Sequence, residues 1–473
     1  MIFLFVMIVS CNNNKTNLKL QSQLEELYMA HNFLMVENIL TGIEKPLSSD
    51  LKYMADSLMD YIDRYRTEYP LTESDLLKIL KERGIDASPT LVEQWEKKKQ
   101  LDYLVMDGEK RYFKNAAYNL VLLNDSLASV AGSTSLNDDH LGAFCVSHIS
   151  DVINMSSIER MGEVVCPENF LLNFSLRIHP GKVTPGSPVS VWMPFGVKDF
   201  SRQSEVRLLR SSVPDFSLSS EKCAHQSVFM TRDADEDGAA EFSVSSLVTS
   251  KAQYFSPERL LQSRFVELPD SVIPFAKERG PHLVFSNRIK ELADSLTDEG
   301  MRPFEMVRRF YYWIDENIPW ARAVEYGLIP NISKYTLENM HGDCGMQTML
   351  FMSMCRYKGI PARWQSGWML HPGNVNLHDW CEVWYEGVGW VPVDVSFKLQ
   401  KSKDKRIREF YISGIDAYRF IVNKDFGREF CPPKSWPRSE PWDFQRGEAE
   451  WEKGNLYFDD WSYDMEVTYA GRL

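Results

Sequence analysis

The sequence lacks several common catalytic and metal-binding signatures. Its eight cysteines include no C-x-x-C pair, which argues against a zinc ribbon. No G-x-S-x-G segment occurs, so the nucleophile elbow of a serine hydrolase is missing. With 53 Lys and Arg against 66 Asp and Glu, the formal net charge is −13, which argues against nucleic acid as the main partner. Beyond the first few residues, no apolar run is long enough to span a membrane.

What is present is the composition of an ordinary globular protein, at 44% hydrophobic and 25% charged residues. The 473 residues suffice for roughly two to four domains. Some of the cysteines could pair in an oxidising compartment, but the sequence does not say which.

The N-terminus differs from the rest of the chain. Residues 2–9 are all apolar, and Ser10 and Cys11 follow them. The segment Ile8-Val9-Ser10-Cys11 resembles a bacterial lipobox, in which the cysteine is lipidated after cleavage. No Lys or Arg precedes the apolar run, which departs from the usual signal pattern, and an ordinary N-terminus is the alternative. The resemblance predicts a lipid anchor on Cys11 in the bacterial cell envelope, facing the periplasm or the cell surface.

The chemistry is concentrated in residues 341–397, beginning with Cys344. Gly342 and Asp343 precede this cysteine, and an apolar-rich run follows it up to Gly359. The pattern predicts a helix of about 14 residues that begins at or next to Cys344. A thiol there meets the positive end of the helix dipole and unpaired N–H groups, which favour the thiolate and could also hold an oxyanion.

Two β-rich segments follow the helix. Residues 379–385 and 389–395 alternate, with Glu386 and Gly387 as a short turn, and this pattern predicts a hairpin. If Tyr385 pairs with Val388, His378 and Asp394 lie opposite each other or one step off. An imidazole and a carboxylate at that spacing can form a hydrogen bond that orients the ring.

These residues closely resemble the core of the transglutaminase-like superfamily of papain-type folds. The resemblance rests on four segments in the family's order: Gly342-Asp343-Cys344, Gly359-Ile360-Pro361-Ala362-Arg363, His378-Asp379-Trp380 and Gly389-Trp390-Val391-Pro392-Val393-Asp394. It implies that Cys344 is the nucleophile, His378 its base and Asp394 the residue that orients the base. It also implies an α+β fold, in which a helix carrying the cysteine packs on an antiparallel sheet carrying the histidine and aspartate. We expect Trp368 and Trp380 to contact substrate, and we expect no cofactor.

The surrounding patterns predict five segments. They are a signal peptide at 1–11, a mainly helical region at 12–124, a β-rich middle domain at 125–283, the transglutaminase-like core at 284–400, and an aromatic-rich C-terminal extension packed on the core at 401–473.

Three weaker candidates compete with the triad. His371 is a rival base, but no partner carboxylate is evident for it. A metal site from His341, Asp343, Cys344 and either His371 or His378 fits known ligand spacings poorly. Asp233, Asp235 and Asp237 match the front of a calcium loop, but Val244 stands where an EF-hand needs its glutamate, so an acidic hairpin turn is the better interpretation.

The sequence therefore predicts a cell-envelope thiol enzyme that cleaves or transfers an amide acyl group, with peptidase or amidase activity preferred over transglutaminase activity. The substrate would be a peptide or protein amide, and a cell-wall peptide is one option. A non-catalytic binding or scaffold lipoprotein with the same fold is the alternative. A glycan-binding role, based on the tail aromatics, has no assignable carboxylate pair.

Overall fold

The computed structural model describes residues 14–43, 47–124, 126–127, 136–156, 162–198 and 200–471. The predicted signal peptide and Cys11 lie outside these residues. Within them, none of the helices combines the length and the apolar character that crossing a bilayer requires. The chain divides into two compact units, one formed by Met1–Thr134 with Trp320–Pro330 and the other by Ser135–Pro319 with Asn331–Leu473.

The first unit is mainly helical, in agreement with the periodicity of its sequence. Its described elements are α1 (Asn14–Met29), α2 (Phe33–Thr41), α3 (Ser49–Glu68), α4 (Glu73–Glu82), α5 (Pro89–Lys97), β1 (Tyr103–Met106), β2 (Glu109–Tyr112), α6 (Ala116–Leu122) and η3 (Tyr326–Leu328). Local capping fixes helix starts. Thr72 and Asp75 form a capping box at α4, because each side chain accepts a hydrogen bond from the other residue's backbone N–H.

The segment Trp320–Pro330 joins this unit although it lies far along the chain. Glu325 accepts a hydrogen bond from Nε of Arg64 at 3.0 Å, and the Tyr65 hydroxyl donates to the carbonyl of Leu328 at 2.9 Å. Such pairings between distant segments carry no local sequence signal.

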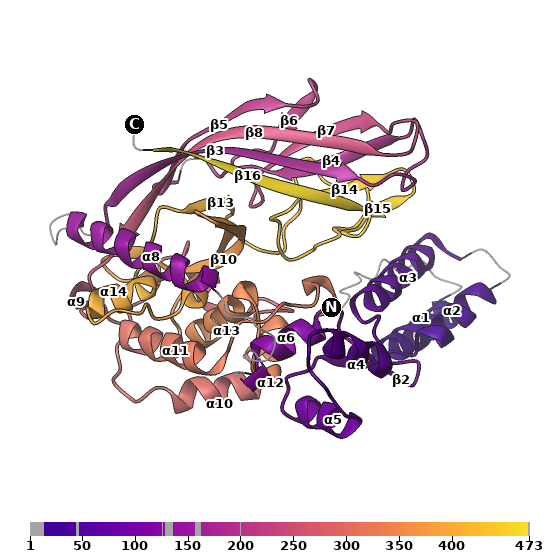
Figure 1. Ribbon diagram of the computed structural model, residues 1–473, viewed down its shortest axis with the longest axis horizontal. Helices are drawn as coiled ribbons and strands as arrows, with labels where there is room; N and C mark the ends of the chain where they lie inside the picture. The colour runs from indigo at the N-terminus through magenta and orange to yellow at the C-terminus, as the bar shows by residue number, and fades with distance from the viewer. Residues whose placement is uncertain are drawn as a thin grey trace. The chain divides into compact units, whose positions relative to one another are not determined.

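The second unit contains two five-stranded antiparallel sheets (Figure 1). The first has the order β12-β8-β3-β16, with β5 also paired to β8, and the second has the order β15-β14-β4-β7-β6. Their strands are β3 (Val164–Ile178), β4 (Pro188–Pro194), β5 (Gln203–Ser211), β6 (Phe216–Leu218), β7 (Ser227–Asp233), β8 (Ala240–Tyr254), β12 (Gly414–Ile415), β14 (Glu448–Trp451), β15 (Gly454–Leu456) and β16 (Trp461–Gly471).

The last strands of the chain complete both of these sheets. β16 pairs antiparallel with β3 over most of its length, and β14 pairs with β4. Figure 1 shows β16 in yellow beside β3 in magenta. The C-terminal residues therefore do more than pack on the core that carries Cys344, because the outer strands of the β-rich region come from them. Strand alternation indicates which residues are buried but not which distant strand is the partner.

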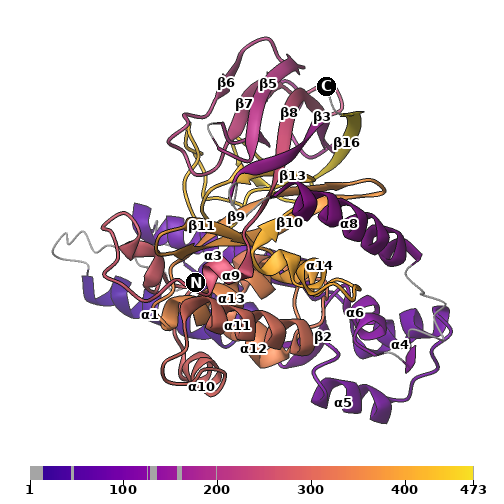
Figure 2. The same cartoon turned by 90° about the vertical axis from the view of Figure 1, so that its left-hand side faces the viewer.

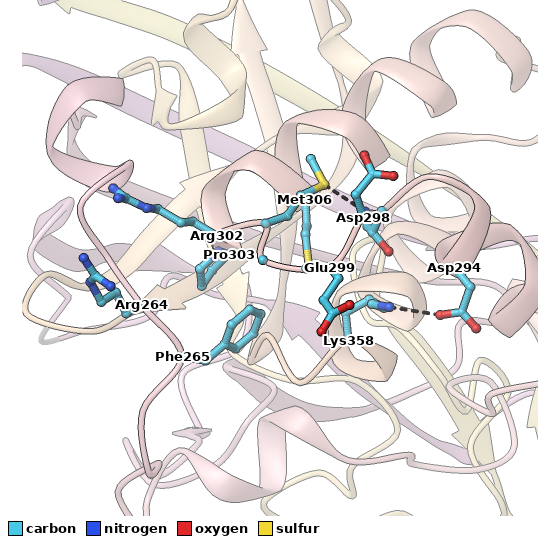
Figure 3. A pocket seen from close by; sticks show the side chains of 12 residues that line it. Arg264, Phe265, Asp294, Asp298, Glu299, Arg302, Pro303, Met306 and Lys358 are labelled. Carbon is cyan, nitrogen blue, oxygen red and sulfur yellow. Dashed lines mark hydrogen bonds and ion pairs between the residues drawn. The ribbon is translucent and has the colours of Figure 1, made fainter.

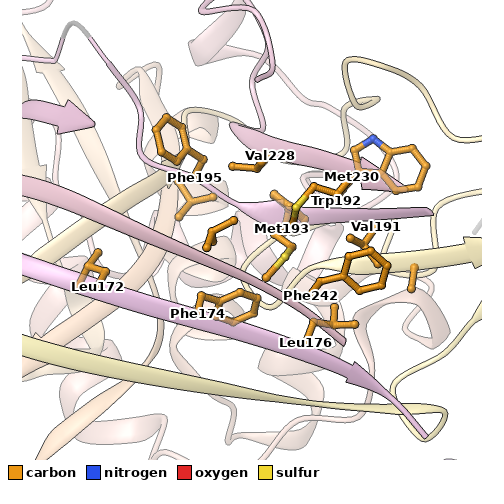
Figure 4. Packing of buried hydrophobic residues seen from close by; sticks show 14 of the residues in the cluster. Leu172, Phe174, Leu176, Val191, Trp192, Met193, Phe195, Val228, Met230 and Phe242 are labelled. Atoms are coloured by element: carbon orange, nitrogen blue, oxygen red, sulfur yellow. The ribbon is translucent and has the colours of Figure 1, made fainter. Parts of the chain in front are cut away.

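One hydrophobic core lies between these sheets. It includes Phe174 of β3, Trp192 of β4, Met230 of β7 and Phe242 of β8, all at most 2% exposed (Figure 4). Alternate residues of β3 and β8 face it, as the period of two in a strand requires. Full burial of one such side chain is worth roughly 1.5–3 kcal/mol, so this core contributes strongly to the stability of the unit.

That neighbouring layer is a four-stranded antiparallel sheet of order β11-β10-β9-β13. Figure 2 shows helices α10 to α13 on one side of it and the larger sheets on the other. The elements are α10 (Asn287–Ser295), α11 (Pro303–Asn317), α12 (Ile332–Asn339), α13 (Cys344–Tyr357), β9 (Ala362–His371), β10 (Asn374–Tyr385), β11 (Gly389–Val393) and β13 (Arg419–Asn423). The mixed α+β fold with antiparallel sheets agrees with the prediction.

The helix α8, several short elements and a disulfide complete this unit. The remaining described elements are α8 (Leu136–Met155), α9 (Pro257–Leu260), η2 (Ile273–Ala276), η4 (Val395–Phe397), α14 (Lys405–Arg408) and η5 (Phe410–Ile412). Cys223 and Cys431 form a disulfide across 208 residues of sequence. The sequence did not identify this pair.

Candidate active site

The helix α13 places Cys344 at its first residue, as the sequence predicts. Asp343 is the N-cap, and its Oδ1 accepts a hydrogen bond from the backbone N–H of Met346 at 3.0 Å. A Cβ atom on Gly342 would lie 2.7 Å from Cβ of Met346, so the chain can turn into the helix only with glycine there. The thiol is thereby held at the helix N-terminus.

The hairpin of β10 and β11 carries His378, with a register that differs from the predicted one. Tyr385 pairs with Gly389 rather than with Val388, because three residues, Glu386 to Val388, form the connection. Asp394 follows the end of β11 and caps η4. Its Oδ2 nevertheless lies 2.7 Å from Nε2 of His378, and both residues are buried.

Asp394 sits among compensating groups. Besides His378, it is paired with Arg419 of β13, whose Nη2 lies 3.0 Å from Oδ2, and it accepts a hydrogen bond from the Ser396 hydroxyl at 3.0 Å. Burial acts to raise the pKa of Asp394, but His378, Arg419 and Ser396 together lower it below its ordinary value. The carboxylate is therefore ionised and fixes one ring nitrogen of His378.

The Cys344 thiol faces a different environment. It is partly exposed and donates a hydrogen bond to Oδ2 of Asp379 at 3.2 Å. Among the described residues this aspartate, and not His378, is its hydrogen-bond partner. Packing around the thiol, then Asp379 and Asp343, raise the pKa of Cys344 well above the ordinary value. The helix dipole predicts the opposite direction, but a dipole is equivalent to about half a charge and is outweighed here by the packing around the thiol and by two carboxylates.

Asp379 itself is 2% exposed and belongs to a buried polar cluster. Its Oδ1 accepts a hydrogen bond from Nε2 of Gln445 at 2.7 Å. Its cross-strand partner Ser366 donates its hydroxyl to Oδ1 of Asp443 at 2.6 Å. Burial first, and then Asp443 and Asp343, raise the pKa of Asp379 well above its ordinary value. The thiol thus lies beside a carboxyl group that takes up a proton readily.

Residues 290–395 match the family model of the transglutaminase-like superfamily. They form a transglutaminase-like domain. The matched range contains Cys344, His378 and Asp394, and it leaves most of the chain outside the match.

The chain is also similar to individual proteins. It is 24% identical to the uncharacterised protein YebA of Bacillus subtilis (strain 168) over 169 residues, which are 32% of this chain and 21% of that protein. The match therefore spans about a fifth of that relative.

Two solved structures are similar at lower identity. One, a candidate cysteine protease from Cytophaga hutchinsonii, is 16% identical with a TM-score of 0.42 and covers 65% of this chain and 92% of its own. The other, the periplasmic domain of TgpA from Pseudomonas aeruginosa, is 17% identical with a TM-score of 0.24 and covers 50% of this chain and 91% of its own.

The expectation that Trp368 and Trp380 contact substrate is wrong for this structure. Trp368 is 1% exposed and Trp380 is fully buried. Their ring N–H groups donate to the carbonyl of Gln445 and to Oε1 of Gln365, at 2.7 and 2.8 Å. Both indoles are packing residues of the transglutaminase-like domain. Their strands lie in a sheet that is covered on both faces, so a large ring on either face is buried.

His371, the rival base, has a partner that the sequence did not reveal. Its Nε2 lies 3.3 Å from Oδ1 of Asp416, and both residues are buried. Burial lowers the pKa of His371 despite this carboxylate. The same Asp416 pairs with Arg419 at 3.0 Å, and Arg419 pairs with Asp394. His371 is therefore linked to Asp394 through these two charged residues.

The structure does not support the metal alternatives. In the part of the chain it describes, no three His, Cys, Asp or Glu side chains are placed to hold an ion. This applies to Asp343, Cys344 and the neighbouring histidines, and to Asp233, Asp235 and Asp237. The acidic segment is a tight turn, in which the Asp237 carboxylate accepts from the N–H of Ala239 at 3.0 Å. It connects β7 of one sheet to β8 of the other, so it is not the hairpin turn that the sequence predicts.

A cavity of about 770 Å³ lies at the opposite end of α13 (Figure 3). Lys358, which caps the C-terminus of α13, lines this cavity, and its Nζ donates a hydrogen bond to Oδ1 of Asp294 at 2.9 Å. Since α13 has 14 residues at 1.5 Å per residue, this cavity is roughly 20 Å from Cys344. Phe265, Met306 and a mixed set of charges surround it, and none of the predicted triad residues does.

Sequence reasoning missed four residues around the site: Arg419, Asp379, Asp443 and Gln445. Asp379 carried a usable signal, because an acidic residue next to the predicted base in a strand of the predicted core needs a partner when it is buried. The others come from beyond residue 400 and have no motif.

Proposed function

We propose that this chain is a thiol enzyme that cleaves or transfers an amide acyl group through Cys344, His378 and Asp394. The observation that carries the proposal is the buried His378–Asp394 pair, 2.7 Å apart, within a transglutaminase-like domain whose helix α13 begins at Cys344. A buried carboxylate that orients an imidazole beside a nucleophile is the arrangement that acyl transfer requires.

The chemistry follows from which atoms are engaged. Nε2 of His378 is held by Asp394, which leaves Nδ1 to take the proton of the Cys344 thiol. The thiolate attacks the carbonyl carbon, and the imidazolium returns the proton to the departing amine. The N–H of Met346 is bound by Asp343, so the N–H groups of Cys344 and Gly345 are the helix donors left for the oxyanion.

The acyl-enzyme then passes its acyl group to water or to an amine. Water gives a peptidase or amidase, which we prefer, and an amine gives a transglutaminase. The preferred substrate is a peptide or protein amide, with a cell-wall peptide as one option.

Turnover by variants tests the mechanism. A mixture of peptides is incubated with the protein and a fluorescent primary amine, and new amino termini and amine incorporation are both measured. Cys344→Ala should abolish both signals, whereas Cys355→Ala, which removes a buried thiol from the same helix, should retain them. Turnover that survives in Cys344→Ala overturns the proposal. New amino termini indicate hydrolysis, and amine incorporation indicates transfer.

The proposal places the protein in the bacterial cell envelope, anchored through a lipid on Cys11. The Cys223–Cys431 disulfide supports this, because disulfides persist in oxidising compartments and are rare in the cytosol. The wild-type protein should partition into the detergent phase of a cloud-point extraction, and Cys11→Ser should move it to the aqueous phase. Equal partitioning of both proteins contradicts the anchor.

A non-catalytic binding or scaffold role is the second candidate. It is favoured by one observation, the raised pKa of a Cys344 thiol bonded to Asp379. Iodoacetamide labelling separates the two roles. In an enzyme, His378→Ala should slow the labelling of Cys344 near neutral pH, and in a binding protein it should have no effect.

A further inference from the structure

Asp379 and Asp443 are two carboxyl groups buried together behind the Cys344 thiol. They are 2% and 6% exposed, and Ser366, the cross-strand partner of Asp379, donates its hydroxyl to Asp443 at 2.6 Å. Each carboxylate of a buried neighbouring pair disfavours the charge of the other, so such a pair favours holding one proton between its members.

Each carboxyl group of the pair has its own donors. Asp443 accepts from the Ser366 hydroxyl at 2.6 Å and from Nδ2 of Asn423 at 3.4 Å. Asp379 accepts from Gln445 on one oxygen and from the thiol of Cys344 on the other. Hydrogen-bond donors therefore surround both carboxyl groups, and the Cys344 thiol is one of them.

The charges that face the pair come from several elements. Asp343 at the start of α13 and Asp394 after β11 add negative potential at Asp379, and Arg438 adds positive potential at Asp443. His378 is the neighbour of Asp379 on β10, but its ring is bonded to Asp394. The cation thus lies on the Asp443 side, and the thiol lies on the Asp379 side.

We propose that Asp379 and Asp443 share a single proton, and that the negative charge left on the pair keeps Cys344 protonated in a resting arrangement. Asp379 is then a positioning residue for the thiol, additional to Cys344, His378 and Asp394. This inference rests on the proposed role of Cys344 as nucleophile and adds a regulation of that site. A second proton on the pair removes its negative charge, so on acidification the pair no longer opposes ionisation of the Cys344 thiol.

The two aspartates should respond oppositely to the same substitution. In Asp379→Asn, the remaining charge sits on Asp443, away from the thiol and beside Arg438, so the thiol ionises more easily. In Asp443→Asn, Asp379 loses its proton-sharing partner and carries the full charge beside the thiol, so the thiol ionises less easily. Loss of structure would change both variants in the same direction.

The experiment is iodoacetamide labelling of the full chain between pH 5 and 9, with Cys344 quantified by mass spectrometry. Lowering a thiol pKa by one unit raises the thiolate fraction tenfold and reduces its intrinsic nucleophilicity about threefold, so the rate rises about threefold per unit. At pH 7 we expect Asp379→Asn to label at least about threefold faster than wild type, and Asp443→Asn at least about threefold slower.

The shape of the pH profile gives a second readout that a purely structural role would not change. In the wild type, the labelling rate should fall less than tenfold for each unit of pH decrease over the range in which the pair takes up its second proton. Loss of the pair's charge makes the thiol easier to ionise there, which partly offsets the loss of thiolate to acid. In Asp379→Asn, the fall should return to about tenfold per unit.

Some outcomes overturn the inference and leave the proposed function intact. If both variants label Cys344 at the wild-type rate, or if both change it in the same direction, the pair does not control the thiol. Turnover that depends on Cys344 and His378 would still support the thiol mechanism. Conversely, opposite shifts together with turnover that survives in Cys344→Ala would retain the carboxyl pair and reject the enzyme.

Discussion

Two buried aspartates at opposite ends of the site, Asp394 and Asp379, show how surroundings decide charge. Both are at most 2% exposed. Asp394 faces an imidazole and the guanidinium of Arg419, and its pKa is lowered. Asp379 faces a thiol and a second carboxyl group, and its pKa is raised. Burial raises both, so the difference comes entirely from the partners, and the same residue type is a fixed anion on one side and a proton acceptor on the other.

The largest expected effect comes from removing the charge on the Asp394 side. Asp394→Asn should lower kcat by about 10²–10⁴-fold with little change in KM, because an amide neither orients the imidazole in the required tautomer nor stabilises the imidazolium. Steady-state kinetics on the substrate found by peptide screening measures this. Asp416→Asn is the matched control, since Asp416 also pairs with Arg419 but does not contact His378. A change confined to KM would rule out the orienting role.

Removing the compensating cation should have the next largest effect. Arg419→Met keeps much of the apolar stem but leaves Asp394 and Asp416 buried with less compensation, so the free energy of unfolding should fall by about 3–5 kcal/mol. Urea unfolding measures the change. Arg177→Met removes an arginine from an exposed pair with Glu241 and should stay within about 0.5 kcal/mol of wild type. Equal effects of the two substitutions would show that the network around Asp394 is not stabilising.

The pH dependence of stability should distinguish the two aspartates by sign. The lowered pKa of Asp394 contributes stability above the unfolded-state value of about 3.9, and this is lost as pH falls. The raised pKa of Asp379 contributes stability below that value, and this is lost as pH rises. At pH 7, Asp394→Asn should therefore be less stable than wild type and Asp379→Asn more stable, the latter by roughly 1–3 kcal/mol.

Thermal or urea unfolding across pH 4–8 tests both signs. The advantage of Asp379→Asn should shrink as the pH falls from 7 toward 4, because the unfolded chain then takes up the proton that the folded carboxyl group already holds. The deficit of Asp394→Asn should persist to about pH 4 and shrink only below it, where the folded carboxylate is protonated. A destabilised Asp379→Asn at pH 7 would mean that the hydrogen bond from Cys344 outweighs the charge that Asp379 carries.

The sequence predicted the local elements of the site much better than the distant partners of the two aspartates. The helix of Cys344 and the hairpin of His378 follow from local patterns, and both are confirmed, although Gly387 and Gly389, both with positive φ, support a longer turn than expected and shift the register. The environment of Asp379 depends on Gln445, which is 66 residues away, and that of Asp394 on Arg419, which is 25 residues away. Pairings at such distances are fixed by which strands meet, and no local period encodes that choice.

Two serine hydroxyls offer the smallest and most closely matched test of the comparison. Ser396 donates to Asp394 at 3.0 Å and Ser366 donates to Asp443 at 2.6 Å, so each supports one carboxylate. Ser396→Ala and Ser366→Ala should each change stability by only about 1 kcal/mol. Ser396→Ala should reduce turnover without altering iodoacetamide labelling of Cys344. Ser366→Ala should slow that labelling instead, because Asp443 loses a donor and more charge moves to Asp379. If the two substitutions affect turnover and labelling alike, the Asp394 and Asp379 environments act as one network rather than two.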